Sequence, residues 1–162
     1  MINVIYVAVC GGGDCGEVTA QLAEAIGAEL ARSNAAVICG GGGGVMEAVS
    51  RGVNREGGIV LGILPGEDPR GGNEYLTAAL ATGMGEARNA LIARSCDAVI
   101  AIGGEYGTLS EIALALKMGK PVVGINTWEL YPYGKKGADS GITYTSTPEE
   151  AVEEALQQIP EW

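Results

Sequence analysis

Three short apolar runs in this chain are each followed by a glycine-rich segment and then by a stretch with helical spacing. The pairs of run and glycine-rich segment are residues 3–9 with 11–13, 35–39 with 40–44, and 98–102 with 103–107. An apolar run of this length, bounded by turn residues, predicts a buried strand. Strands that alternate with helices predict a parallel sheet covered by helices on both faces. We therefore expect an α/β chain with a three-layer, Rossmann-like fold.

The same alternation continues along the whole chain. Further strands are expected at 58–64, 121–125 and 142–145, with an ambiguous short strand at 74–80, and helices at 17–32, 45–53, 86–94, 109–118 and 148–158. Asp14 is available near the first helix as a cap or a favourable charge. Thr147, followed by Pro148 and Glu150, predicts a capped start for the last helix. No linker divides the sequence, so one domain is expected over residues 1–162.

Composition excludes several classes of function. The formal net charge of −10 disfavours a nucleic acid or an anionic membrane as partner. No apolar stretch is long enough to span a bilayer, and no basic region precedes the first run, so neither a membrane span nor a signal peptide is expected. The four cysteines form no C-x-x-C pair and histidine is absent, which argues against a metal site and a histidine-based nucleophile. Reduced cysteines fit a cytoplasmic protein.

The glycine clusters indicate where a ligand could bind. In parallel sheets, ligands bind beyond the carboxyl ends of the strands, near a switch in strand order. Glycine lets the backbone approach a ligand closely, and the N-terminus of the next helix favours phosphate. Tight strand-to-helix turns explain the cluster at 11–13 equally well, whereas ligand contact is favoured at 40–44 and 103–107.

Neither of two common nucleotide motifs is complete. Gly11, Gly13 and Gly16 have the G-x-G-x-x-G spacing, but the second strand ends at Cys39 and Gly40, without the expected acidic residue. No Gly-Lys-Ser/Thr follows, so there is no Walker loop.

Four polar residues near the third cluster are candidates for chemistry. Thr108 can cap its helix and offer a hydroxyl group to phosphate, and Glu111 lies one turn further on. Arg88 can bind phosphate or stabilise developing charge, and the alternative is a surface arginine paired with Glu86. Asn89 can bind a hydroxyl group or simply lie near a helix start.

Residues 83–125, "GMGEARNALIARSCDAVIAIGGEYGTLSEIALALKMGKPVVGI", together with "VICGGGGGVMEA", resemble the Lonely Guy superfamily, once mislabelled lysine decarboxylase. It includes cytokinin-activating phosphoribohydrolases and molybdenum-cofactor carriers. The resemblance covers residues 1–126. The family motif P-G-G-x-G-T-x-x-E falls on residues 103–111, and the upstream family arginine falls on Arg88.

The resemblance implies roles for individual residues. Arg88 and Glu111 would be the catalytic pair that cleaves the N-glycosidic bond of a nucleoside 5′-monophosphate, and hydrolysis would need no cofactor. The residues implied in ligand or phosphate binding are Gly11, Gly12, Gly41, Gly42, Gly43, Met84, Asn89, Gly103, Gly104, Tyr106, Gly107 and Thr108. The bound cargo could instead be a pterin, the molybdenum cofactor. The resemblance also implies a homodimer or a larger homo-oligomer.

Three functions remain open. Gly103 replaces the motif's proline, Glu105 replaces a glycine, and Asn89 stands where many relatives carry lysine, which favours ligand binding over hydrolysis. The alternatives are a phosphoribohydrolase and a structural assembly module built on the apolar helices and the aromatic loop around Trp128. Lysine decarboxylation is rejected, because Lys117, Lys120, Lys135 and Lys136 all lie away from the expected pocket.

Overall fold

The computed structural model describes residues 4–134 and 140–160, and within them seven strands form one parallel sheet in the order β4-β3-β2-β1-β5-β6-β7. The strands are β1 (Tyr6–Gly11), β2 (Ala36–Cys39), β3 (Val60–Leu64), β4 (Ala78–Ala81), β5 (Ala98–Ile102), β6 (Val122–Ile125) and β7 (Ile142–Tyr144). The expected parallel sheet is confirmed. The ambiguous segment at 74–80 contributes β4, which pairs with β3.

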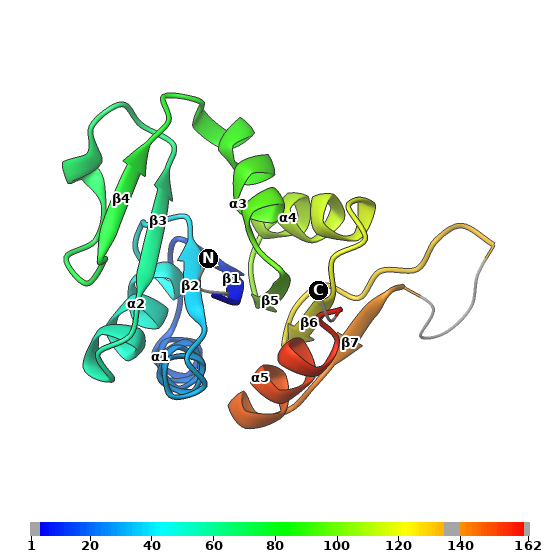
Figure 1. The fold of residues 1–162 in the computed structure, drawn as a ribbon. Coiled ribbons are helices and arrows are strands. Elements are labelled where there is room, and N and C mark those ends of the chain that lie inside the picture. The colour runs from blue at the N-terminus through cyan, green and yellow to red at the C-terminus, as the bar shows by residue number, and fades with distance from the viewer. Residues whose placement is uncertain (1–3, 135–139, 161–162) are drawn as a thin grey trace.

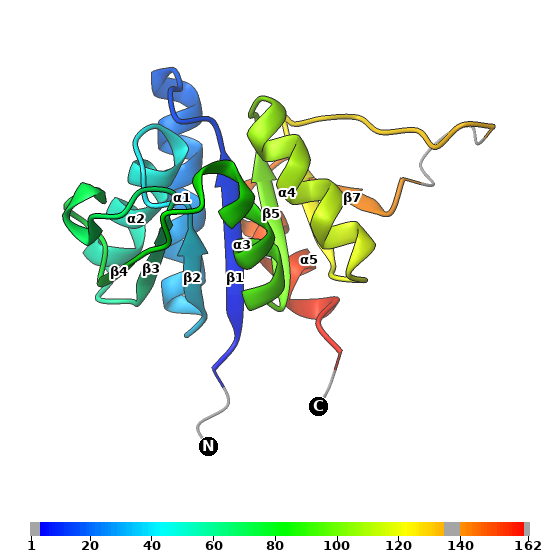
Figure 2. The same cartoon turned by 90° about the horizontal axis from the view of Figure 1, so that it is seen from above.

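Helices cover both faces of the sheet (Figures 1 and 2). One face packs against α1 (Glu17–Arg32), α2 (Val45–Arg55) and α5 (Pro148–Gln157), and the other against α3 (Asn89–Ser95) and α4 (Tyr106–Lys117). Each face has its own apolar core, so the three-layer architecture is confirmed. Among the described residues, no helix combines the length and the apolar character that crossing a membrane requires.

The strand β5 explains why the sequence shows uninterrupted apolar runs. All five of its side chains are fully buried. Ala98, Ile100 and Ile102 belong to the core beneath α1, α2 and α5, whereas Val99 and Ala101 belong to the core beneath α3 and α4. Because successive side chains point to opposite faces and both faces are covered, every position must be apolar.

Two glycines let α1 and α2 pack at backbone contact. A Cβ atom at Gly52 would lie 2.0 Å from the Glu24 carbonyl oxygen, and one at Gly27 would lie 2.3 Å from the Val49 carbonyl oxygen. Any larger side chain would push the helices apart. Gly27 and Gly52 are therefore packing residues and not flexible points.

The helix starts differ in part from those expected. The helix α4 begins at Tyr106, with Glu105 as the N-cap residue and no side-chain cap. The prediction that Thr108 caps this helix is therefore wrong. The apolar periodicity becomes visible only from residue 109, whereas the first turn is formed by residues that leave no apolar signature. The N-cap residue of α1 is Gly16, and Asp14 gives this helix no side-chain cap. Thr147 caps α5 as expected by accepting a hydrogen bond from the Glu150 amide.

The segment expected as one helix at 86–94 consists of two pieces. A short 3-10 helix, η2 (Gly85–Arg88), leads directly into α3. A second 3-10 helix, η1 (Pro69–Gly71), lies in the loop between β3 and β4. Arg88 is therefore at the junction of η2 and α3.

The strand order reverses between β1 and β5. The chain builds β1 to β4 outward on one side and then crosses to β5 on the other side of β1. The loops after β1 and β5 consequently diverge, which opens a crevice at the carboxyl edge of the sheet.

Candidate functional site

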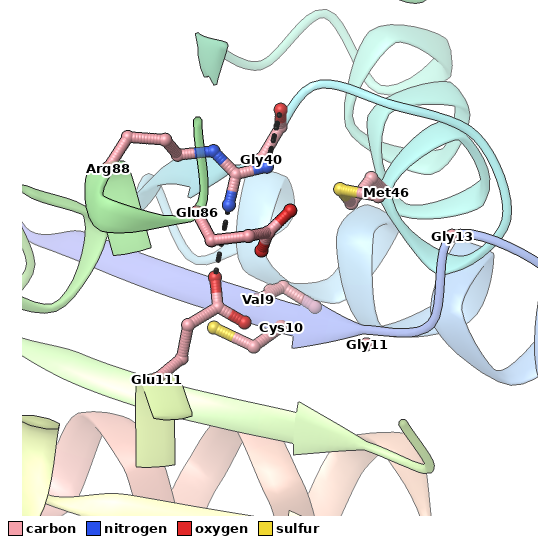
Figure 3. Close-up of a pocket in the computed structure, with 9 residues that line it drawn as sticks. All are labelled: Val9, Cys10, Gly11, Gly13, Gly40, Met46, Glu86, Arg88 and Glu111. Atoms are coloured by element: carbon pink, nitrogen blue, oxygen red, sulfur yellow. Dashed lines mark hydrogen bonds and ion pairs between the residues drawn. The ribbon is translucent and has the colours of Figure 1, made fainter. Parts of the chain in front are cut away.

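A cavity of about 210 Å³ lies at this switch point (Figure 3). Its lining comes from β1 and the loop after it, from the loop after β2, and from α2, η2 and α4. The lining residues are Val9, Cys10, Gly11, Gly13, Gly40, Met46, Glu86, Arg88 and Glu111. The cavity lies at the carboxyl edge of the sheet, where the sequence predicts ligand binding. The glycine clusters after β1 and β2 contribute to its lining, and the cluster at 103–107 does not.

A second cavity of about 460 Å³ adjoins the first on the side of β3. The two share Gly13, Gly40, Met46 and Arg88, and the larger one extends to the loop after β3, at residues 64–71. Arg88 thus lines two adjoining cavities at the carboxyl edge of the sheet.

Arg88 is buried, with 8% of its surface exposed. One guanidinium nitrogen, Nη1, lies 4.0 Å from Glu111 Oε1 and donates to Asn89 Oδ1, while Nη2 lies 3.5 Å from the Gly40 carbonyl oxygen. The third nitrogen, Nε, has no acceptor among the described residues. The alternative of a surface arginine paired with Glu86 is excluded by this burial. A buried charged group with an unused donor is uncommon in folded proteins, so this Nε–H needs an explanation.

Gly40 makes room for the arginine. A Cβ atom at this position would lie 2.7 Å from Arg88 Nη2 and 2.7 Å from Met46 Sδ. A glycine at the end of β2 is therefore a steric requirement of the buried guanidinium group.

Glu111 forms the floor of the smaller cavity and is only 6% exposed. Burial raises the pKa of its carboxyl group from 4.5 to about 7, with a further rise from the charge of Glu86, while the Cys10 thiol and the Arg88 charge oppose the rise. At neutral pH this carboxyl group can therefore both hold and release a proton. Burial also raises the pKa of the Cys10 thiol well above its usual value, followed by the effect of Glu111, so Cys10 faces the carboxylate as a neutral thiol.

Asn89 connects the arginine to α4. Its Oδ1 accepts from Arg88, and its Nδ2 donates to Ser110 Oγ at 2.9 Å. Ser110 Oγ in turn donates to the Gly107 carbonyl oxygen at 2.7 Å. The side chain is buried, and these contacts hold the first turn of α4 beside Arg88.

The first turn of α4 has amide groups without intrahelical acceptors, and its residues line neither cavity. Glu105 gives no side-chain cap, so the N–H groups of Tyr106, Gly107 and Thr108 are the ones that an α-helix leaves without intrahelical partners. Gly104 has φ of +93°, and a Cβ atom there would overlap the Thr108 hydroxyl at 2.2 Å. Gly104 is thus required both by its backbone conformation and by the buried Thr108 side chain that packs on it.

Of the other predicted glycines, some line a cavity and the others make hydrogen bonds within the loops. Gly42 and Gly43 line the larger cavity, and Gly11 lines the smaller one, where it also packs against Val45. Gly12 accepts a hydrogen bond from the Val45 amide, and the Gly41 carbonyl accepts from Asn73. These last two glycines line neither cavity, and their contacts maintain the loops.

Three further predicted residues lie at the outer rim. Tyr106 is 79% exposed and its ring stacks at 5.6 Å on Trp128, whose indole donates to the Glu105 carbonyl oxygen. The Gly103 carbonyl oxygen accepts from Thr127. Met84 is exposed. None of the three lines either of the two cavities beside Arg88.

Sequence reasoning missed several residues of the site. Cys10, Met46 and Glu86 all line the smaller cavity, and no motif pointed to them. Gly13 and Gly40 belong to the glycine clusters and could have been chosen from their place at the strand ends. The signal for Cys10 was its place as the last residue before a glycine cluster.

The two described lysines line neither of the cavities beside Arg88. Lys117 ends α4, and Lys120 lines a separate cavity with Asp97 and Pro121, whereas Lys135 and Lys136 lie outside the described residues. Within the described part of the chain, no cluster of three or more cysteine, histidine or acidic residues suits a metal ion.

Comparison with known proteins identifies the family. A model of the SLOG cluster4 family matches residues 4–152. The chain belongs to the SLOG cluster4 family. The resemblance to the Lonely Guy and molybdenum-cofactor-carrier superfamily is thereby confirmed, together with the Rossmann-like fold.

Solved structures similar to this SLOG cluster4 chain include a binding protein and a carrier protein of the molybdenum cofactor. The molybdenum cofactor binding protein of Rippkaea orientalis is 30% identical, with a TM-score of 0.88 over 99% of this chain and 100% of that one. The molybdenum cofactor carrier protein of Chlamydomonas reinhardtii is 26% identical, with a TM-score of 0.79 over 97% and 98% of the two chains.

A curated relative points to the second activity. A probable cytokinin riboside 5′-monophosphate phosphoribohydrolase of rice (Oryza sativa subsp. japonica) is 38% identical over 107 residues, which are 64% of this chain. The match spans only 44% of the length of the rice protein. The relatives of this SLOG cluster4 chain thus include both binding proteins and hydrolases of phosphorylated ligands.

Proposed function

We propose that the chain binds a phosphorylated, nucleotide-like small molecule, a nucleoside 5′-monophosphate or a pterin cofactor, at the edge between β1 and β5. The observation that carries the proposal is the buried guanidinium group of Arg88, a residue that lines both cavities at this edge of the sheet. A phosphate or carboxylate oxygen of a ligand is the acceptor that a guanidinium group binds best.

The first turn of α4 supports an anionic ligand. The amides of Tyr106, Gly107 and Thr108 and the positive end of the helix dipole favour a phosphate group. Asn89 and Ser110 link this turn to Arg88. One ligand can therefore meet both the guanidinium group and the amides.

The molybdenum cofactor is the cargo that the structural neighbours suggest. It joins a flat pterin ring system to a phosphate group. The cavities of about 210 and 460 Å³ are in the size range of small-molecule sites, and Gly42 and Gly43 line the larger one without a side chain to obstruct a flat ring. We propose transport or storage of such a cofactor as the first candidate function.

Titration of the purified chain tests the proposal. Calorimetry with AMP, GMP and isolated molybdenum cofactor should reveal binding of at least one of them. Arg88→Gln should weaken that binding by at least about tenfold, because a charge-assisted hydrogen bond is lost. Arg94→Gln is the matched control, since Arg94 is an exposed arginine of α3, the helix that begins directly after Arg88. Absence of binding to all three ligands would overturn the proposal.

Hydrolysis is the second candidate, and the state of Glu111 favours it. A carboxyl group with a pKa of about 7, 4.0 Å from a buried guanidinium nitrogen, suits general acid–base catalysis. In that reaction water adds to C1′ of the ribose as the N-glycosidic bond breaks, its hydroxyl group going to the sugar and its proton to the departing base. The ionised carboxylate would stabilise the oxocarbenium-like sugar or take the proton of water.

Release of ribose 5-phosphate from AMP tests hydrolysis directly. Glu111→Gln should abolish turnover while AMP still binds, and the wild-type rate should change with a midpoint near pH 7. Turnover that survives the substitution would exclude this mechanism. Tight binding without turnover would favour the carrier.

Self-association stays a prediction. Tyr131 and Tyr133 are exposed on the segment that extends outward after β6, where the aromatic loop was expected to contact a second copy. Light scattering of the purified chain measures the mass, and a monomer would contradict the expected homo-oligomer.

A further inference from the structure

The Glu86 carboxylate lines the smaller cavity without an ion-pair partner among the described residues, and the proposed function gives it no role. It extends from η2 over the smaller cavity, on the side that faces Met46 (Figure 3). The neighbouring guanidinium group of Arg88 interacts with Glu111, Asn89 and Gly40 instead. Among the ion pairs of the described residues none includes Glu86.

Glu86 also lies close to the first turn of α4. Its Oε2 atom is 3.9 Å from the position that a Cβ atom would take on Gly107, the second residue of the helix. The carboxylate therefore lines the cavity that contains Arg88 and Glu111 and also lies near the first turn of α4. A dianion bound at the amides of that turn would lie within a few ångströms of a negative charge.

A carboxylate in this position has two opposite effects on ligands. It repels a bare phosphate ion because the two negative charges lie close together, and since Glu86 is exposed, solvent screens part of this repulsion. It also accepts hydrogen bonds and cannot donate them, so it attracts a hydroxyl or ring N–H group placed next to the phosphate. A hydrogen bond to a charged acceptor stabilises such a ligand and offsets the repulsion.

We infer that Glu86 is the specificity-determining residue of this site, which excludes inorganic phosphate and selects phosphorylated ligands that carry a hydrogen-bond donor beside the phosphate. This inference rests on the proposed function. Ribose hydroxyls of a nucleotide and the ring N–H groups of a pterin both meet the requirement. Phosphate esters without such a donor do not.

The relative affinity for two ligands tests the inference. Dissociation constants for AMP and for inorganic phosphate are measured by calorimetry for the wild type, Glu86→Gln and Glu105→Gln. Glu86→Gln should tighten phosphate binding and weaken AMP binding, so that the preference for AMP falls by at least about tenfold. Glu105→Gln removes the same charge from an exposed residue at the N-terminus of α4 that lines neither cavity, and should leave the preference nearly unchanged.

A second measurement separates an electrostatic role from a structural one. The charge of Glu86 is one cause of the raised pKa of Glu111, and Glu105 is not among the causes. Carboxyl 13C NMR titration should therefore give a lower pKa for Glu111 in Glu86→Gln and an unchanged one in Glu105→Gln. A circular dichroism spectrum equal to that of the wild type would establish that each variant is folded.

The outcomes are distinguishable. If wild-type protein binds none of AMP, GMP and the molybdenum cofactor, the proposed binding function fails and the selectivity of Glu86 fails with it. If only the cofactor binds, the cofactor replaces AMP in the same comparison. If AMP binds to the wild type and the preference is the same in Glu86→Gln, only the selectivity is overturned. An equal tightening of both ligands in Glu86→Gln would mean simple repulsion and would likewise overturn it.

Discussion

The buried carboxyl group of Glu111 makes folding stability depend on pH. Its pKa rises from 4.5 to about 7 in the folded chain. The folded state thus binds this proton more tightly than the unfolded state does. The stability that the proton provides is complete below pH 4.5 and is lost as the pH rises through about 7.

The size of the effect follows from the interval between the two pKa values. At about 1.4 kcal/mol for each pH unit, the interval corresponds to about 3 kcal/mol. Glu111 is 6% exposed, so solvent screening reduces this value little. This is a large part of the stability of a single domain, which is typically about 5–15 kcal/mol.

Urea unfolding of the wild type and Glu111→Gln isolates this contribution. Glutamine keeps the shape of the side chain but has no acidic proton. The stability of the wild type relative to Glu111→Gln should fall by about 3 kcal/mol between pH 4.5 and a pH above 7. Other acidic groups titrate in both proteins, so their effects cancel in the difference.

A control fixes the interpretation. The same comparison with Gly52→Ala, which changes stability but removes no acidic group, should be nearly independent of pH. If the difference between the wild type and Glu111→Gln is flat, or rises with pH, the carboxyl group is ionised throughout and the argument for an acid–base role loses its basis.

Three further substitutions probe the frame around the site, each by urea unfolding at one pH. Gly52→Ala should destabilise the chain by about 1–3 kcal/mol, although alanine favours helices. The reason is that its Cβ would lie 2.0 Å from the Glu24 carbonyl oxygen. Unchanged stability would mean that α1 and α2 can separate freely. Thr147→Ala should cost about 1 kcal/mol through loss of the cap to Glu150, whereas Thr147→Ser should cost much less. Gly44→Ala should cost more than about 2 kcal/mol, since φ is +59° and the methyl group would overlap the loop after β1; a stable Gly44→Ala variant would contradict the close contact of the two loops.

The sheet could be predicted because its signals are local. Each buried strand is an apolar run, and each strand end is marked by glycine, so the alternation with helices was visible without a partner strand. The clusters at 11–13 and 103–107 flank the crossover, so the topology predicts ligand binding at this edge, although only the first of the two lines the smaller cavity. Arg88 and Glu111 were found from the spacing of a family motif.

The detailed environment of those residues could not be predicted. Arg88 is buried because Gly40, which is 48 positions away, leaves space for its guanidinium group. Cys10 on β1 and Glu86 on η2 line the same cavity as Glu111, and the sequence around each of them does not indicate this proximity. The sequence predicts that α4 starts at residue 109, because the first turn of the helix has no apolar periodicity. The contacts of that turn are the packing of Thr108 on Gly104 and the hydrogen bond from Asn89 to Ser110.

The five glycines after β2 illustrate why the sequence could not decide between packing and ligand contact. Gly44 packs against the Gly12 carbonyl oxygen, and Gly40 leaves space for Arg88, so both satisfy the protein itself. Gly42 and Gly43 face the larger cavity, where the nearest neighbours of an added Cβ atom are the Met46 side chain and the Gly13 carbonyl. The two interpretations therefore apply to different residues of the same cluster. The loop can present an open surface to a ligand because its first and last glycines fix it tightly against Arg88 and the loop after β1.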